Sequence, residues 1–139
     1  MKKLSIAIAQ LNLIVGDIEA NTQRILQSTA ALSHKADIVV FPELALCGYP
    51  PEDLLLRQEL HDRCDQAIKT LLENVNDTAI LLGHPQKKEG SIQNAASLIH
   101  HHEITAQYAK QRLPNHTVFD EKRYFSPGHK TTVIEFKSL

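Results

Sequence analysis

The fold of this chain is decided by residues 38–56, which read IVVFPELALCGYPPEDLLL. The β-branched run within residues 37–41 is typical of a strand that is buried on both faces. Glu43 stands where this strand should end, and a rigid turn over residues 48–51 follows it. Because α/β sheets present their chemistry at strand ends, this pattern predicts an α/β fold with a carboxylate held at the edge of the sheet.

Periodicity places further strands and two helices around this segment. Asp17 can cap a helix over residues 18–32, where apolar and threonine positions recur every three or four residues. A second helix is predicted from about Leu60 to Val75. Strands are predicted over residues 4–11, 37–41, 78–83, 94–100, 104–108 and 132–136. Helices that alternate with the early strands and cover a mixed sheet imply a layered α/β architecture.

Composition limits the class of protein. A length of 139 residues suits one domain or part of one, and 42% hydrophobic residues allow a buried core. A net charge of −1 gives no basic footprint for nucleic acid. No apolar stretch approaches the ~20 residues that span a bilayer. The charge and the short apolar stretches lead us to expect no nucleic-acid or membrane partner. Two cysteines, Cys47 and Cys64, are too few for a disulfide framework and fit a reducing compartment, so we expect a cytoplasmic protein.

A second polar position lies in residues 108–115, which read YAKQRLPN. Lys110 follows an apolar hairpin strand, as Glu43 follows the earlier strand. A buried ammonium group needs an opposite charge, and the Glu43 carboxylate is a natural one. We therefore expect the two side chains to lie within ion-pair distance. The alternative is a solvated lysine at a strand end.

Residues 38–56 and 108–115 together resemble the nitrilase, or carbon–nitrogen hydrolase, superfamily. The runs GYPPEDLL at 48–55 and VFDEKRYF at 118–125 are similar to the glutaminase domains of glutamine-dependent NAD synthetases. The resemblance implies a nitrilase-like α-β-β-α sandwich. Residues 1–139 would then be a partial carbon–nitrogen hydrolase domain, the first half of that sandwich, with the synthetase domain absent.

The same resemblance assigns roles to the two charged residues. Glu43 would be the general base, and Lys110 would stabilise the negative charge on the substrate oxygen. The family nucleophile is a cysteine that comes after the lysine, but no cysteine follows Lys110 in this chain. We therefore expect the nucleophile to lie beyond Leu139 and this fragment to be inactive alone.

Cys47 is the thiol nearest to Glu43 in the sequence, and a thiol is the nucleophile that this chemistry needs. However, it stands in the loop that follows the base, where the family pattern usually has a small residue. We therefore predict that Cys47 is packed in the core, and that Cys64 belongs to the buried face of the second helix.

The resemblance also implies a glutamine pocket that contains Tyr49, His116 and Glu121. Glu121 would face the α-ammonium of the substrate, and Tyr49 would line the pocket. The alternatives are loop packing for Tyr49 and a surface ion pair for Glu121. His116 stands where the family commonly has tyrosine, and Thr117 stands where it commonly has glycine.

No cofactor is predicted for this domain, because the chain has no glycine-rich phosphate loop for ATP or NAD. The resemblance implies that the missing synthetase domain uses ATP and Mg²⁺ and that the parent enzyme is a homo-oligomer. Residues 100–102 are three consecutive histidines, of which at most two share a strand face, so a hairpin tip is favoured over a metal site.

Two other functions remain open from the sequence. A stand-alone nitrilase-type amidase would share Glu43 and Lys110 but act on another amide. A non-catalytic remnant would serve as an interaction module.

Overall fold

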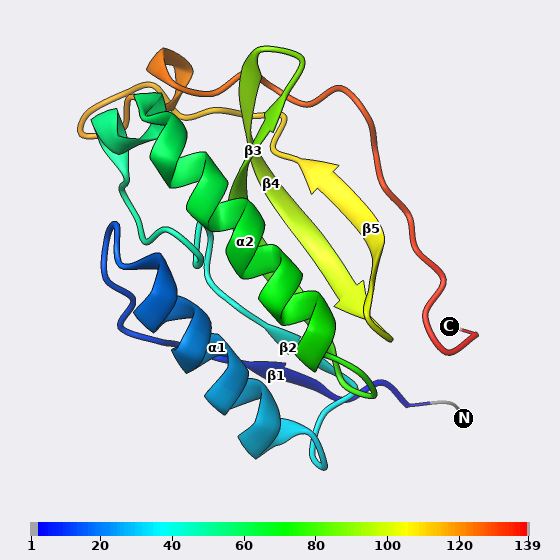
Figure 1. Cartoon of the computed structure of the whole chain (residues 1–139). Helices are drawn as coiled ribbons and strands as arrows, with labels where there is room; N and C mark the ends of the chain where they lie inside the picture. Colours follow the sequence, from blue (N-terminus) through cyan, green and yellow to red (C-terminus); the bar gives the residue numbers. More distant parts are fainter. Residues whose placement is uncertain (1–2, 139) are drawn as a thin grey trace.

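The computed structural model describes residues 3–138 and shows a five-stranded sheet with two helices packed against one face (Figure 1). The strands lie in the order β1-β2-β3-β4-β5, parallel from β1 to β3 and antiparallel from β3 to β5. Their bounds are Ile6–Ile8, Ile38–Val40, Ala79–Lys88, Ser91–His100 and Glu103–Ala109. The helices are α1 (Ile18–Leu32) and α2 (Gln58–Asn74), and two short 3-10 helices are η1 (Glu52–Leu56) and η2 (Glu121–Arg123). The predicted α/β class is confirmed.

The parallel half of the sheet explains why both helices share one face. The chain passes from β1 through α1 to β2, and from β2 through α2 to β3, always towards the next strand along. Crossovers between parallel strands are almost always right-handed, so two crossovers in the same direction place their helices on the same side. The described residues thus form one helical layer on one sheet, which is the form of one half of an α-β-β-α sandwich.

Helix α1 begins as its sequence predicts. The side chain of Asp17 accepts a hydrogen bond of 3.2 Å from the backbone N–H of Ala20, which satisfies a donor of the first turn. Ile18, Thr22 and Ile25 then face the core. The hydroxyl of Thr22 donates to the carbonyl of Ile18, one turn earlier, so this buried polar group is satisfied inside the helix.

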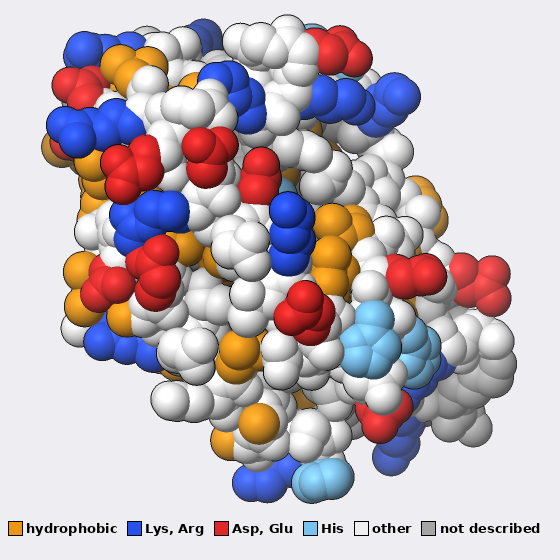
Figure 2. All heavy atoms as spheres, viewed as in Figure 1, with side chains coloured by type: hydrophobic (Ala, Val, Ile, Leu, Met, Phe, Trp, Pro, Cys, Tyr) orange, Lys and Arg blue, Asp and Glu red, His pale blue; other side chains and the backbone are white. Residues whose placement is uncertain are grey.

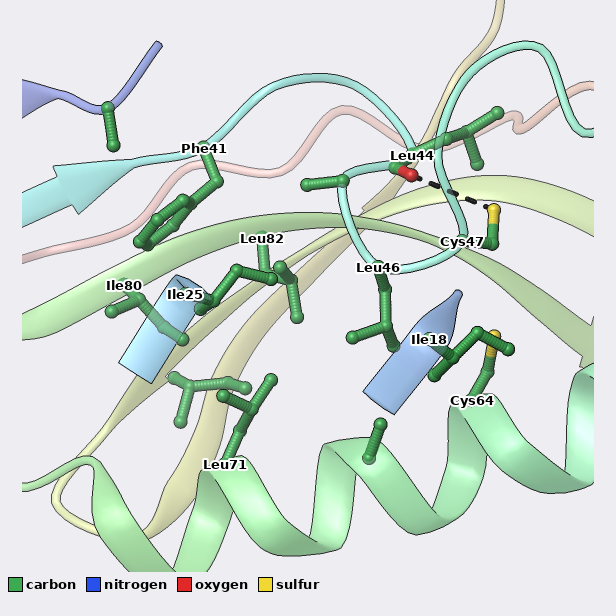
Figure 3. Packing of buried hydrophobic residues seen from close by; sticks show 14 of the residues in the cluster. Ile18, Ile25, Phe41, Leu44, Leu46, Cys47, Cys64, Leu71, Ile80 and Leu82 are labelled. Atoms are coloured by element: carbon green, nitrogen blue, oxygen red, sulfur yellow. Dashed lines mark hydrogen bonds between the residues drawn. The ribbon is translucent and has the colours of Figure 1, made fainter. Parts of the chain in front are cut away.

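The main core fills the space between the helices and the sheet (Figure 3). Ile18 and Ile25 from α1 and Leu71 from α2 meet Ile80 and Leu82 from β3, and these side chains are nearly inaccessible to solvent. The loop after β2 also enters this core through Leu44, Leu46 and Cys47. The segment that carries Glu43 is therefore built on packed apolar side chains.

The antiparallel half consists of two hairpins with two-residue turns. Glu89-Gly90 joins β3 to β4, and His101-His102 joins β4 to β5. All four turn residues have positive φ, which matches the right-handed twist of the flanking strands. The predicted hairpin around His101-His102 is confirmed. Strand β3 is longer than predicted, because it continues past Gly83 and Pro85 to Lys88.

The predicted strand over residues 132–136 is wrong. This segment runs beside β5 as irregular chain, and the hydroxyl of Thr132 donates to the carbonyl of Gln107 at 3.1 Å (Figure 1). Its apolar residues find no strand to pair with among residues 3–138, and Val133 is 90% exposed. The first strand is also shorter than predicted, since only Ile6–Ile8 pair with β2.

The sheet face opposite the helices is only partly covered. Ile38, Leu98 and Phe136 form a small buried cluster there. At the edge of the sheet, Ile6 is 56% exposed and Ile8 is 76% exposed. In residues 3–138, no helix is long and apolar enough to cross a membrane.

Candidate active site

The turn after β2 positions Glu43 at the end of the strand. The backbone N–H of Phe41 still donates to Leu81 at 3.0 Å, and the chain then turns, with the N–H of Ala45 donating to Pro42. This turn lies directly on β3 at Gly83. A Cβ atom on Gly83 would lie only 2.6 Å from the nitrogen of Leu44, so only glycine fits beneath the turn.

Helix α1 holds the same turn from the other side. Asn21 is completely buried, and its amide donates to the carbonyl of Leu46 at 3.2 Å. Leu44, Leu46 and Cys47 are also buried, whereas the Glu43 side chain is 44% exposed. The apolar residues of the turn thus anchor it in the core, and the carboxylate projects from it.

Lys110 is positioned by the end of β5. Its backbone N–H donates to the carbonyl of Asn94 on β4 at 2.8 Å, and its own carbonyl accepts from Gly128 at 2.9 Å. A Cβ atom on Gly128 would lie 2.2 Å from the carbonyl oxygen of Ala109. Two glycines therefore permit the close backbone approaches behind both charged residues.

The structure brings three of the predicted charged groups together. The Lys110 Nζ lies 2.6 Å from Oε1 of Glu43 and 3.1 Å from Oε1 of Glu121. The predicted contact between Glu43 and Lys110 is confirmed. Tyr49 joins the cluster, because its hydroxyl donates to Oε1 of Glu121 at 3.3 Å. Glu121 is only 5% exposed, so it is not part of a surface ion pair.

Electrostatics keep the lysine charged. Burial alone would lower the pKa of Lys110, but hydrogen bonds and opposite charge from Glu43 and Glu121 outweigh burial and raise its pKa. Burial and the nearby charges of Glu121 and Glu43 also raise the pKa of Tyr49. The cluster is therefore a fixed ammonium group between two carboxylates, beside a protonated phenol.

One polar partner was not expected from the sequence. The side-chain amide of Asn94 donates to Oε1 of Glu43 at 2.6 Å, and Asn94 is 5% exposed on β4. The available signal was the asparagine that begins the strand predicted over residues 94–100, because a buried amide needs a hydrogen-bonding partner.

His116 is the predicted pocket residue that the structure does not bring to this cluster. Its ring packs edge-on against Phe119, with centroids 5.9 Å apart. It lines a different hollow, which it shares with Arg112 and Lys122. Its predicted role in substrate binding stays a prediction.

Both cysteines lie in the core, as predicted. Cys47 and Cys64 are buried and unbridged, and burial raises the pKa of each thiol. The Cys47 Sγ points to the carbonyl of Leu44 at 3.7 Å (Figure 3). A thiol with a raised pKa in an apolar environment is a poor nucleophile.

A cavity of about 280 Å³ adjoins the charged cluster. Tyr49 and Glu121 line it, together with Pro50, Asp120 and Phe125. The Oε2 atom of Glu121 lies 3.1 Å from Lys110 Nζ, within ion-pair distance. Among the described residues, however, no donor makes a hydrogen bond of good geometry to this oxygen. This oxygen is inaccessible to solvent, and the cation that it faces is Lys110.

Comparisons with known proteins show the family to which the chain belongs. Residues 5–138 match the carbon–nitrogen hydrolase family. The glutamine-dependent NAD(+) synthetase of Acinetobacter baylyi is 44% identical over 138 residues, which cover 98% of this chain and 25% of that protein. The corresponding protein of Aquifex aeolicus is 41% identical over 134 residues, which cover 95% of this chain and 24% of that protein. The chain thus spans about a quarter of the length of these relatives.

Solved structures show the same similarity in three dimensions. The glutamine-dependent NAD+ synthetase from Acinetobacter baumannii superposes with a TM-score of 0.91 at 39% identity, over 97% of this chain and 26% of that chain. An amidase from Nesterenkonia sp. superposes with a TM-score of 0.80 at 26% identity, over 91% of this chain and 49% of that chain. With a family match over nearly its whole length and a shared fold, this chain belongs to the carbon–nitrogen hydrolase family.

Proposed function

We propose that this chain is part of a glutaminase that hydrolyses the side-chain amide of glutamine. The ammonia would be used by a synthetase domain that converts deamido-NAD to NAD with ATP and Mg²⁺. The observation that carries the proposal is the contact of Lys110 with both Glu43 and Glu121 at the sheet edge. The identity to glutamine-dependent NAD synthetases supports the choice of substrate.

The proposed mechanism uses a thiol nucleophile and the two residues at the strand ends. Glu43 accepts the thiol proton, and the thiolate attacks the amide carbon of glutamine. The Lys110 ammonium stabilises the negative charge that develops on the substrate oxygen. The protonated Glu43 returns its proton to the amide nitrogen, so that the C–N bond breaks, ammonia leaves and a thioester remains. Glu43 then takes a proton from the water that attacks the thioester, and this proton passes to the sulfur when the C–S bond breaks to release glutamate and regenerate the thiol.

The nucleophile is proposed to come from outside residues 1–139. Cys47 is packed against the carbonyl of Leu44, and no cysteine follows Lys110 in this sequence. On this proposal the 139-residue chain alone does not turn over glutamine, and it forms the partial glutaminase domain of a longer enzyme.

The glutamine pocket is proposed to be the cavity beside the charged cluster. Glu121 would face the α-ammonium of glutamine, and Tyr49 would line the pocket. No cofactor is proposed for this domain. A homo-oligomer in the cytoplasm is proposed for the parent enzyme, and the unbridged cysteines are compatible with that reducing compartment.

A stand-alone amidase is the second candidate. The observation behind it is the superposition on the Nesterenkonia amidase, which is 26% identical over 91% of this chain. In that case the pocket would take a small amide without an α-ammonium group.

The test uses a chimera in which residues 5–138 replace the matched segment of the Acinetobacter baylyi synthetase, hereafter the synthetase chimera. NAD formation is measured with glutamine or with ammonium as the nitrogen source, and amide hydrolysis is measured with glutamine or propionamide. We expect glutamine to support NAD formation and to be hydrolysed much faster than propionamide. Glu43→Gln should lower the glutamine-supported rate at least ~10²-fold.

The ammonium-supported rate is the control for folding, because it bypasses the glutaminase. Normal ammonium-supported synthesis with no glutamine-supported synthesis in the unsubstituted chimera would contradict the proposal. Faster hydrolysis of propionamide than of glutamine would support the amidase candidate instead.

A further inference from the structure

We propose that Asn94 is a positioning residue for the base: its amide holds one oxygen of Glu43 beside Lys110 and leaves the other oxygen to accept a proton. The role of Glu43 as the base rests on the proposed function. The contact between Asn94 and Glu43 does not depend on the proposed function, and neither does the experiment that tests this contact.

Asn94 contacts both charged residues through different groups. Its backbone carbonyl accepts the N–H of Lys110 at 2.8 Å, which fixes the end of β5. Its side-chain nitrogen donates to Oε1 of Glu43 at 2.6 Å. One buried residue of β4 therefore sets the relative position of two segments that are far apart in the sequence.

The chemistry of the amide decides which of its atoms faces Glu43. A carboxylate oxygen can only accept hydrogen bonds, so an amide oxygen at 2.6 Å would be repelled. The nitrogen of Asn94 must therefore point to Glu43. Lys110 Nζ contacts the same Oε1 at 2.6 Å, so both donors converge on one oxygen.

This convergence leaves the two oxygens of Glu43 in different environments. Oε1 receives hydrogen bonds from Asn94 and Lys110, whereas Oε2 receives none from the residues that the structure describes. The Glu43 side chain is 44% exposed and has three rotatable bonds, so the turn alone does not fix its carboxylate. Asn94 is the contact to a rigid, buried part of the sheet.

The positioning of Glu43 requires that Asn94 be uncharged as well as that it donate a hydrogen bond. The cluster already holds two carboxylates and one ammonium group, Glu43, Glu121 and Lys110. Aspartate at position 94 would have nearly the same shape but would place a third negative charge 2.6 Å from Glu43. Leucine would keep the branching at Cγ and the backbone hydrogen bond to Lys110 but would remove the donor.

The contact itself is tested in the 139-residue chain by NMR. We expect Glu43→Ala to shift the two side-chain amide signals of Asn94 and to speed the exchange of their protons with solvent, because the hydrogen bond to the carboxylate is lost. The side-chain amide of Gln93, the adjacent residue on β4, is the internal reference. Unchanged behaviour of the Asn94 signals in Glu43→Ala would overturn the inference, whether or not the protein hydrolyses glutamine.

The effect on catalysis is tested in the synthetase chimera. Because a misplacement of about 1 Å can cost ~10²-fold in rate, we expect Asn94→Leu to lower kcat for glutamine by about that factor and to leave KM within about threefold. The acidic limb of the pH–rate profile should move to higher pH, and Asn94→Asp should lose more activity than Asn94→Leu.

Gln93→Leu is the matched control, since it removes an amide from the same strand without touching the cluster. It should change neither kcat nor the pH profile, and ammonium-supported NAD formation should persist in all variants. A rise in KM at constant kcat in Asn94→Leu would show that Asn94 serves substrate binding and not the base, and would overturn the inference. If Asn94→Leu does not fold, the NMR comparison, which keeps Asn94, still decides.

Discussion

At the scale of the residue, two glycines, Gly83 and Gly128, are as important for the geometry of the site as its charged side chains. Gly83 lets the turn with Glu43 lie directly on β3, and Gly128 does the same for the chain beside Lys110. Neither glycine has a positive φ, so the requirement is for space and not for backbone conformation. Close approach of two backbones is a recurrent reason for glycine in a strand.

Gly83→Ala tests this packing. Its Cβ would lie 2.6 Å from the nitrogen of Leu44 and 2.7 Å from the carbonyl oxygen of Pro42, so the turn must move away from β3. We expect a loss of about 1–3 kcal/mol in the free energy of unfolding, measured by denaturant titration, and a large loss of glutamine-supported activity in the synthetase chimera.

Gly90→Ala is the control for Gly83→Ala. Gly90 has a φ of +80° but open space around it, so the substitution should cost stability without changing activity. Equal activity of the two variants would contradict the role given to Gly83.

Cys47→Ala separates the two placements of the nucleophile. Because Cys47 is fully buried and its thiol pKa is raised, we expect the synthetase chimera to keep its glutamine-supported rate within a few-fold and to lose about 1 kcal/mol of stability. Thermal melting and NAD formation measure the two effects. A folded variant without glutamine turnover would place the nucleophile at Cys47.

The sequence predicted the charged residues of the site better than it predicted their supports. Glu43, Lys110, Tyr49 and Glu121 stand in motifs, and the structure brings them into contact. The contacts of Asn94 and Gly83 depend on which strands become neighbours, and this is a tertiary property.

At the scale of the element, the two helices are joined across their exposed faces. The Nε and Nη2 atoms of Arg63 on α2 donate to the two carboxylate oxygens of Glu19 on α1, and Nη2 also donates to the carbonyl of Gly16. Figure 2 shows basic and acidic side chains interspersed over this helix-bearing face. Hydrogen bonds from Arg63 lower the pKa of Glu19 from 4.5 to about 2.

This shift predicts an acid-dependent loss of stability. Because the pKa of Glu19 is lowered in the folded state, its contribution is complete above about pH 4.5 and disappears as the pH falls through about 2. The Glu19 side chain is 67% exposed, so solvent screening limits the contribution to ~0.2–1 kcal/mol.

Glu19→Gln should therefore lose less stability than the unsubstituted chain between pH 6 and pH 2, as followed by thermal melting. Glu73→Gln on the exposed side of α2 is the control and should behave like the unsubstituted chain. Identical pH dependence of Glu19→Gln and the unsubstituted chain would exclude the ion pair as a source of stability.

Elements with strong local signals were predictable, and elements that need a distant partner were not. The periodicity and the Asp17 cap define α1, and the buried stripe of α2 defines that helix. In contrast, the strand predicted over residues 78–83 continues to Lys88 as β3, because β4 pairs with it from Ile80 to Lys88. Residues 132–136 have the composition of a strand, but a strand forms only where another backbone is available to pair.

At the scale of the whole molecule, the two faces of the sheet differ. The helices lie on one face of the sheet (Figure 1). Ile6, Ile8 and Tyr108, at the edges of the other face, remain exposed. Exposed apolar side chains that adjoin the small cluster around Phe136 favour contact with another apolar surface.

We therefore expect the 139-residue chain to self-associate in sedimentation velocity experiments. The double substitution Ile6→Lys and Ile8→Lys should shift it towards the monomer, because each buried isoleucine contributes ~1.5–3 kcal/mol. Leu56→Lys is the control, since Leu56 is 65% exposed but lies on η1 away from the sheet face. A monodisperse monomer with a sharp thermal transition before any substitution would refute this expectation.

The central claim is that Lys110 and Glu43 form one catalytic unit for glutamine hydrolysis. Its most direct test is the ratio of glutamine-supported to ammonium-supported NAD formation in the synthetase chimera with Lys110→Met, Glu43→Gln or both. We predict that each single substitution lowers this ratio at least ~10²-fold and that the double substitution costs little more than either, because residues that act as a unit are not additive. A ratio that stays near that of the unsubstituted chimera in Lys110→Met, with ammonium-supported synthesis intact, would contradict the claim.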